Sequence, residues 1–404
     1  MTKKYLFIIS ILLSTFSISY AQTAIHQWTT HAPAMKVVSV DMMKDKIFAA
    51  TPYEVFYYNT NDNSINKLSK VNGLSDFGVS VIRHNPHTNH LFVGYSNTNI
   101  DLIDNDDNVI NINDIKNKNI IGTKTINDVY FIDHLAYVCC SFGIVVVDMN
   151  RKEIHDTYII GKNGTYINVN DITLYNNKLY AATSNGVYYA DYPNEHLADF
   201  SQWTLDTSMQ HHDINYSEIE TFNNKLYANY SDNQWYADTL FVYDGESWDY
   251  YDKYSTSIKR EIRAYEDRML FVEHFSASVV DVNNMTIMYF TSIEPFAGIY
   301  DRNRNVYWIG DATNSLVKMK KDKDYEYVRF NGPYSDSSFE IKAKGDRVWV
   351  ASGGYTLTWA KRWLNDGVSF YDNNSWSYLN RENVEALDTI TDLVCIAFDP
   401  TNDY

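Results

Sequence analysis

Short apolar runs separated by polar turns recur along the whole chain. One unit contains three segments, residues 169–174, 179–183 and 187–191, with the length and the Val, Ile, Leu and Tyr content of strands. The turns between them, Asn-Asn-Lys at 176–178 and Ser-Asn-Gly at 184–186, suit the left-handed backbone of tight hairpins. Because the unit contains only strand signals, the pattern predicts an all-β fold.

The unit repeats, and an aromatic residue on its second strand marks each copy. The marker residues are Phe48, Phe92, Tyr137, Tyr180, Tyr227, Phe271, Tyr307 and Trp349. A period of about forty residues with only strand signals is typical of a β-propeller, in which each four-stranded blade buries its faces against its neighbours. The sequence therefore predicts a seven-bladed β-propeller of four-stranded blades over residues 22–334.

The pattern is interrupted at Pro333, and an eighth repeat follows around Trp349. A further inner strand begins at Thr391, and a blade is not expected to leave its apolar face uncovered. We interpret residues 335–404 as the truncated beginning of a second β-propeller. Two segments compete to complete the last blade of the first propeller: an outer strand around Trp28, and residues 325–330.

The first 21 residues have the features of a signal peptide. Lys3 and Lys4 precede an apolar run that ends near Tyr20, and the small residues Ser19 and Ala21 stand before a cleavage point. We therefore expect residues 1–21 to be removed and the chain to be exported. No later apolar run approaches the roughly 20 residues of a membrane-spanning helix.

Composition narrows the choice of partner. The chain has 34 Tyr, 19 Phe and 9 Trp, an aromatic content that suits half-buried strands. It carries 51 acidic and 34 basic residues, a formal net charge of −17. This sign opposes binding to nucleic acid, which depends on basic side chains.

Residue patterns for catalysis or for metal binding are not convincing. His84, His87 and His90 flank a turn, but no cysteine or carboxylate joins them at ligand spacing. The sequence has no nucleophile elbow, phosphate-binding loop or zinc-protease motif. We expect neither catalytic residues, nor a metal, nor a cofactor.

A binding surface is predicted on one rim of the propeller, where the loops between second and third strands meet. Aromatic and amide side chains in these loops suit a sugar or a partner loop. The predicted contacts are Tyr53, Asn97, Asn99, Phe142, Trp235 and Tyr355. The alternative for each aromatic residue is packing between neighbouring blades.

A basic run stands out in this acidic chain. It contains Lys318, Lys320 and Lys321. We predict contact with an anionic group such as a lipid head group or phosphate, and the alternative is a solvated turn.

Several segments resemble known propeller families. Residues 68–76, Leu-Ser-Lys-Val-Asn-Gly-Leu-Ser-Asp, place a Gly-Leu-Ser turn before an inner strand and resemble blades of two-component-regulator propellers. Residues 97–103, 142–148 and 153–161 are more specifically similar to the N-terminal propeller of the PorZ family, which belongs to the type IX secretion system of Bacteroidetes.

This resemblance implies a non-enzymatic binding or scaffold subunit of the attachment complex, on the cell-surface side of the outer membrane. It implies as partners a PorU-like sortase with PorV and PorQ, and anionic lipopolysaccharide. The alternative is a periplasmic ligand-sensing propeller ectodomain of a hybrid two-component regulator. A propeller enzyme that processes glycans is a weaker third reading.

Overall fold

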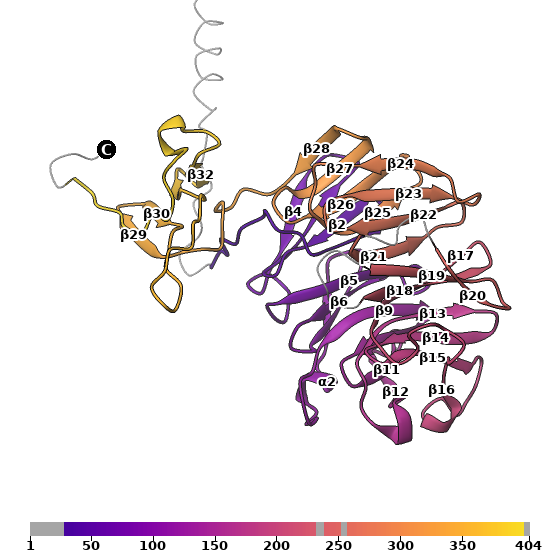
Figure 1. Ribbon diagram of the computed structural model, residues 1–404. Helices are drawn as coiled ribbons and strands as arrows, with labels where there is room; N and C mark the ends of the chain where they lie inside the picture. The colour runs from indigo at the N-terminus through magenta and orange to yellow at the C-terminus, as the bar shows by residue number, and fades with distance from the viewer. Residues whose placement is uncertain (1–27, 232–237, 252–256, 400–404) are drawn as a thin grey trace, which may run out of the picture. The chain divides into compact units, whose positions relative to one another are not determined.

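The computed structural model describes residues 28–231, 238–251 and 257–399, and its regular elements are almost entirely β-strands (Figure 1). The described strands form eight four-stranded antiparallel sheets, and each sheet consists of four strands consecutive in the chain. The prediction of an all-β chain built from four-stranded propeller blades is therefore confirmed. The predicted signal peptide, residues 1–21, lies outside the described residues.

The first four sheets run as follows. The first comprises β1 (Ser39–Met43), β2 (Lys46–Ala50), β3 (Val55–Asn59) and β4 (Ile65–Leu68), and the second β5 (Val79–Asn85), β6 (His90–Tyr95), β7 (Ile100–Ile103) and β8 (Val109–Ile112). The third comprises β9 (Ile126–Ile132), β10 (Leu135–Cys140), β11 (Gly143–Asp148) and β12 (Glu153–Tyr158), and the fourth β13 (Val169–Tyr175), β14 (Lys178–Thr183), β15 (Gly186–Asp191) and β16 (Thr204–Leu205).

The other four sheets follow the same order. The fifth comprises β17 (Tyr216–Phe222), β18 (Lys225–Ser231), β19 (Asp238–Tyr243) and β20 (Trp248–Tyr250), and the sixth β21 (Lys259–Ala264), β22 (Arg268–Glu273), β23 (Ala277–Asp281) and β24 (Thr286–Phe290). The seventh comprises β25 (Pro295–Asp301), β26 (Val306–Asp311), β27 (Ser315–Lys321) and β28 (Asp324–Val328), and the eighth β29 (Glu340–Lys344), β30 (Arg347–Ala351), β31 (Val368–Asp372) and β32 (Ser375–Leu379).

Helices are short in the described part of the chain. They are α2 (Asp114–Asn117), η1 (Lys162–Gly164), η2 (Phe200–Gln202) and η3 (Glu385–Leu387). No helix there has the length and apolar character needed to cross a membrane.

The eight marker aromatics lie on the second strands of the eight sheets, as predicted. The first seven are buried, whereas Trp349 in the eighth sheet is partly exposed. The turns that precede these strands also follow the prediction. Asn176 and Asn177 have φ values of 46° and 57°, and the equivalent Asn223 and Asn224 have 49° and 55°. Asparagine therefore provides left-handed turns that would otherwise need glycine.

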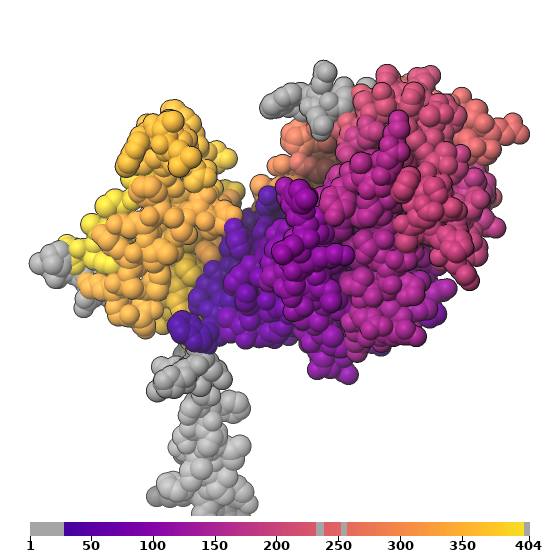
Figure 2. Space-filling view, turned by 90° about the horizontal axis from the view of Figure 1, so that it is seen from below, coloured from indigo at the N-terminus to yellow at the C-terminus, as the bar shows by residue number. Residues whose placement is uncertain are grey.

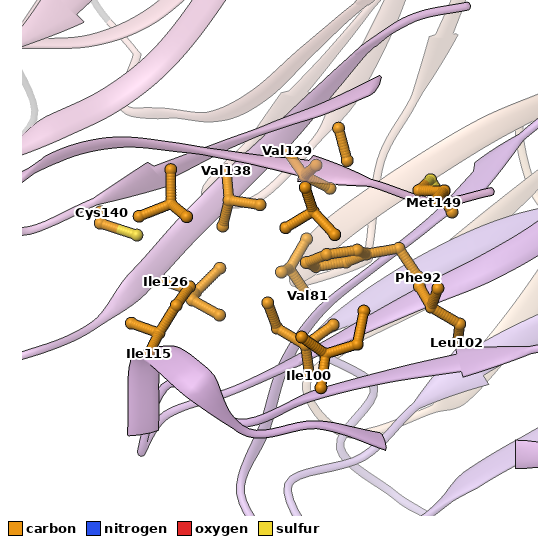
Figure 3. Close-up of a cluster of buried hydrophobic side chains, with 14 of the residues drawn as sticks. Val81, Phe92, Ile100, Leu102, Ile115, Ile126, Val129, Val138, Cys140 and Met149 are labelled. Carbon is orange, nitrogen blue, oxygen red and sulfur yellow. The ribbon is translucent and has the colours of Figure 1, made fainter. Parts of the chain in front are cut away.

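The first seven sheets are adjacent in a cyclic order. The inner strands β1, β5, β9, β13, β17, β21 and β25 each contact the next, and β25 contacts β1. The first sheets follow one another in chain order across the face shown in Figure 2, from indigo to magenta. Apolar clusters fill the spaces between sheets. In the cluster between the second and third sheets, Phe92 meets Val81, Val129 and Ile100 (Figure 3).

Another cluster joins the seventh sheet to the first. Trp308 and Phe330 pack there with Ile47 and Phe56. The chain before β1 lies between the two sheets, because the Val37 N–H donates to Asp311 O at 3.0 Å while the Val38 N–H donates to Ala50 O at 2.8 Å.

The seventh sheet is completed by β28, so the later of the two competing segments supplies its fourth strand. Residues 28–30 contain no strand, and the expectation of an outer strand around Trp28 is wrong for the described residues. Trp248 and Trp376 lie on outer strands, and Trp203 directly precedes β16.

The eighth sheet differs from the other seven in burial. Ile341 on β29 is 63% exposed, and the side chains of β32 are exposed or partly exposed. The assignment of residues 335–404 to a second propeller remains a prediction.

Candidate functional site

The inner strands of the first seven sheets line a central channel. One cavity of about 510 Å³ is bordered by residues from all seven strands and opens among the first residues of each strand. A second cavity of about 340 Å³ lies toward the other ends of six of these strands, all except β25. Because the second-to-third-strand loops lie at the end where inner strands begin, the larger cavity opens on the rim that the sequence singled out.

The side chains at the second position of five of the seven inner strands lie around this opening, and we call them the mouth ring (Ser80, Asn127, Asn170, Arg260 and Phe296). Four of the five donate a hydrogen bond to the first backbone carbonyl of the next inner strand. The bonds are Ser80 Oγ to Ile126 O at 3.5 Å, Asn127 Nδ2 to Val169 O at 2.6 Å, Asn170 Nδ2 to Tyr216 O at 2.6 Å and Arg260 Nη1 to Pro295 O at 2.9 Å.

A chain of amides extends the mouth ring over the third, fourth and fifth sheets. Asn127 donates to Asn168 Oδ1 at 2.9 Å, Asn168 donates to Asn170 Oδ1 at 2.5 Å, and Asn170 donates to Asn215 Oδ1 at 3.0 Å. These bonds fix the amide groups before any ligand arrives. An amide oxygen has two lone pairs, so each retains capacity to accept a further hydrogen bond.

The opposite side of the mouth is cationic and aromatic. The Arg260 guanidinium carbon lies 4.1 Å from the centre of the Phe296 ring, and the Lys36 ammonium lies 5.1 Å from the same ring. Arg260 also pairs with Glu294 at 3.5 Å. A guanidinium has five N–H donors, so these contacts leave Arg260 able to bind an anionic group at the mouth.

Below the mouth, charged residues cross the channel. Arg83 contacts Asp128 at 2.8 Å and Glu261 at 2.7 Å. Arg263 contacts Glu261 at 3.1 Å and Asp41 at 3.5 Å. These ion pairs link the first, second, third and sixth sheets through the channel.

Carboxylates of the channel wall also accept backbone N–H groups of the neighbouring blade. Asp41 accepts from His84 at 2.9 Å, Asp171 from Ile219 at 2.9 Å, and Glu261 from Gly298 at 2.8 Å. An innermost strand has no neighbour strand on its channel side, so its N–H groups need such acceptors.

Several of these carboxyl groups are held toward the neutral form. Burial, together with the charge of Asp128, raises the pKa of Asp171 well above its usual range. Burial, together with the charge of Asp171, does the same for Glu218. Burial raises the pKa of Glu220 to about 7, although backbone hydrogen bonds from Thr221 and Ala264 oppose this rise.

Together these groups suit a polar, saccharide-like ligand. Amide and carboxylate oxygens accept hydrogen bonds from hydroxyl groups, Phe296 offers a flat apolar surface, and Arg260 offers a cation. Three of the charged channel residues have a signal in the sequence. Asp41, Arg83 and Glu220 all pair in register with the marker aromatics Phe48, Phe92 and Tyr227 on the adjacent strands.

The predicted rim residues have varied surroundings. The half-buried Tyr53 donates to Asp336 Oδ2 at 2.7 Å, and burial and this hydrogen bond raise its pKa to about 12. Asn97 and Asn99 both donate to Asp76 Oδ2, at 2.6 Å and 3.5 Å. Asn97 is exposed, whereas Asn99 is 2% exposed. Their amides therefore brace the loop of the second sheet, in addition to any role in binding.

The structure corrects the expectation that Phe142 is an exposed stacking contact. Phe142 is 4% exposed and packs in the cluster between the second and third sheets, with its ring 6.2 Å from that of Tyr166. It is a core residue rather than a stacking contact, which is the alternative that the sequence left open. Trp235 lies outside the described residues.

The remaining predicted residues lie elsewhere. Tyr355 lies in the loop between β30 and β31 of the eighth sheet, and its ring is 5.8 Å from each of Phe339 and Trp359. Lys318 pairs with Glu326 at 2.9 Å, whereas Lys320 and Lys321 are exposed at the end of β27. Those predicted residues that the structure describes are not gathered into one site.

The cyclic order of four-stranded sheets around a polar channel defines a β-propeller. Residues 47–204 match the family model described as the N-terminal β-propeller domain of PorZ, of the type IX secretion system. This confirms the resemblance predicted from the sequence. Comparison with curated proteins gives no match.

Two solved structures have a similar fold. One is PorZ, described as an essential bacterial surface component of the type IX secretion system of Porphyromonas gingivalis, with a TM-score of 0.73 and 18% identity over 89% of this chain and 47% of that one. The other is the extracellular domain of a protein described as a hybrid two-component system of B. thetaiotaomicron, with a TM-score of 0.55 and 10% identity over 89% of this chain and 49% of that one. The chain thus spans about half the length of each.

Proposed function

We propose that this chain is a non-enzymatic binding and scaffold subunit of a type IX secretion system, exported to the cell-surface side of the outer membrane. The observation that carries the proposal is the match of residues 47–204 to the PorZ N-terminal propeller. The solved structure of PorZ, which is described as a surface component of that system, supports the same assignment.

By analogy with the family, the complex would attach secreted cargo to the cell surface, with a PorU-like sortase, PorV and PorQ as partners. The ligand would be an anionic lipopolysaccharide that enters the mouth ring. Arg260 would bind its anionic group, Phe296 would stack on a sugar, and Asn127 would accept from hydroxyl groups. The rim residues Tyr53 and Asn97 would extend this contact.

Titration of purified anionic lipopolysaccharide against the full chain tests the ligand part of the proposal. Arg260→Gln is expected to weaken binding about tenfold, because it removes a charge-assisted hydrogen bond. Arg151→Gln is the control, since it removes the same charge from a side chain that is 72% exposed on the third sheet. Equal binding by wild type and Arg260→Gln would argue against the mouth as the site.

Deletion of the gene tests the cellular part. Cargo of the secretion system is expected to lose its attachment to the cell surface, and the full-length gene is expected to restore it. Normal attachment in the deletion strain would contradict the proposal.

The second candidate is a periplasmic sensor ectodomain, favoured by the fold shared with the two-component protein of B. thetaiotaomicron. Under this alternative, deletion would leave cargo attachment intact and abolish a transcriptional response to a ligand.

A further inference from the structure

The outer strand of the sixth sheet is unusual in this acidic protein. No acidic or basic residue occurs from 282 to 293, a stretch that includes all of β24. Most other outer strands of the first seven sheets carry charge, as with Lys67 in β4, Glu153 in β12, Asp249 in β20 and Glu326 in β28. Charged residues on an edge strand prevent pairing with other chains.

Two outer strands lack charge for evident reasons. β16 has only two residues, and the apolar side chains of β8 are buried or half-buried. β24 differs from both, because Ile287 and Tyr289 are 44% and 50% exposed, and Met285 just before it is 61% exposed. Exposed apolar residues that gather on one strand are a common mark of an interaction surface.

The backbone of β24 also has an open edge. At its end, the Thr291 N–H donates to Asp322 Oδ1 at 3.0 Å, and the Tyr325 hydroxyl donates to Thr291 O at 2.6 Å. The amide of Thr291 therefore points away from β23. Because alternate residues of a strand point to the same edge, the N–H and C=O of Tyr289 face outward as well. Among the described residues no strand pairs with this edge.

Lysines stand at one end of the open edge. Asp322 and Tyr325 belong to the hairpin of β27 and β28, which thus lies against the end of β24 (Figure 1). Lys320, Lys321 and Lys323 of this hairpin are exposed. A ligand strand along β24 would meet an uncharged surface and then these three exposed lysines, which alternate with Asp322 and Asp324.

We propose that β24 binds an extended segment of a partner protein by β-strand addition, and that this segment has alternating apolar residues and an acidic end. The ladder would use the outward N–H and C=O of Tyr289, and apolar side chains of the partner would cover Ile287 and Tyr289. The acidic end would lie at Lys321 and Lys323. A bulge in the pairing of β23 with β24, at Val279 and Val280, limits the ladder to the end of β24 near these lysines. This surface is separate from the mouth ring, and the proposal does not depend on the secretion assignment.

A labelled synthetic peptide tests the proposal with the full chain. Its sequence alternates valine and threonine and ends in two glutamates, and binding is followed by fluorescence anisotropy. The same peptide with N-methyl groups on alternate residues keeps the side chains and removes the ladder donors. We expect the methylated peptide to bind at least about tenfold more weakly.

Variants of the protein locate the contact. Tyr289→Pro removes an outward N–H that takes no part in pairing with β23, and it is expected to abolish binding. Tyr289→Thr keeps that N–H and is expected to retain most of the binding. The double variant Lys321→Gln, Lys323→Gln is expected to weaken binding and to reduce the salt dependence of binding. The double variant Lys152→Gln, Lys162→Gln is the control for net charge, because Lys152 lies on the third sheet and Lys162 in the loop after it.

The outcomes are decisive in both directions. Equal binding of the methylated and unmethylated peptides would exclude strand addition, whether or not Tyr289→Pro folds. No detectable binding of the unmethylated peptide to wild type would overturn the proposal. Equal effects of the two lysine pairs would exclude the hairpin as the acidic-end site.

Discussion

The side-chain amide of Asn127 donates a hydrogen bond of 2.6 Å to the backbone carbonyl of Val169, the first residue of the next inner strand. Asn170 makes the same bond to Tyr216, and Arg260 makes it to Pro295. One strand position is thus used repeatedly to join neighbouring blades around the channel mouth. The polar groups at the mouth are therefore fixed by the fold, which lowers the entropy cost of binding a ligand there.

The first prediction concerns this bond. Asn170→Asp replaces the side-chain NH2 group, which donates two hydrogen bonds, with one oxygen that faces the acceptors Tyr216 O and Asn215 Oδ1. The free energy of unfolding in urea at neutral pH is expected to fall by about 1–3 kcal/mol. Asn177→Asp is the control, because Asn177 lies in an exposed turn. Equal stability of the two variants would show that the bond contributes little.

The second prediction concerns pH. The pKa of Glu220 is raised from 4.5 in the unfolded chain to about 7, and the pKa values of Asp171 and Glu218 are raised as well. Between the unfolded and folded pKa values, the folded chain binds more protons than the unfolded chain. The free energy of unfolding therefore falls as pH rises through this window.

The expected contribution of Glu220 to this fall is about 3 kcal/mol between about pH 4.5 and pH 7. Urea unfolding across this range measures it. Glu220→Gln is expected to flatten the profile, since glutamine does not titrate. A free energy of unfolding that rises steadily from pH 5 to pH 8 would contradict the raised pKa values of these carboxyl groups.

The third prediction concerns the contact between the seventh and first sheets. A methyl group on Gly310 would lie 2.6 Å from Val37 Cγ1 and 2.9 Å from Val40 Cγ2. Gly310→Ala is expected to lower the free energy of unfolding by about 1–3 kcal/mol through overpacking.

Combining Gly310→Ala with Val37→Ala should recover part of this loss, because the second change removes the clashing methyl group. Gly345→Asn is the control, since that glycine has open space around it and asparagine tolerates its φ of 65°. A double variant that loses the full sum of the two single effects would argue against this contact.

The fourth prediction follows from the position of Phe142. Phe142→Ala leaves a cavity in the cluster between the second and third sheets and is expected to cost about 3–5 kcal/mol of unfolding free energy. Phe275→Ala is the control, because that ring is 56% exposed, and its effect should be small. Loss of ligand binding by Phe142→Ala without loss of stability would instead support the prediction that Phe142 contacts a ligand.

The sequence predicted most of the regular structure because each blade repeats a local pattern. The marker Tyr180 is buried on the second strand of its blade, and Asn176 and Asn177 form the turn before it, as expected. Each blade buries one aromatic residue and places a left-handed turn before it. Both are local requirements, so a single unit is enough to predict them.

The binding site was harder to predict because it depends on relations between blades. Asn127 and Arg260 are different types of residue, and only their common position at the start of an inner strand links them. Phe142 could not be separated from an exposed loop residue by sequence alone, because its burial depends on packing against the neighbouring sheet. Lys321 was identified as part of a basic run, but its position beside β24 required the contact of Thr291 with Asp322.

The most direct test of the proposed role is proteolysis of whole cells that produce the full-length protein. If the protein is a surface subunit, an added protease will digest it in intact cells to the same extent as in cells with a ruptured outer membrane, while a periplasmic marker stays protected in the intact cells. Complete protection in intact cells, with digestion only after rupture, would contradict the account and place the protein in the periplasm.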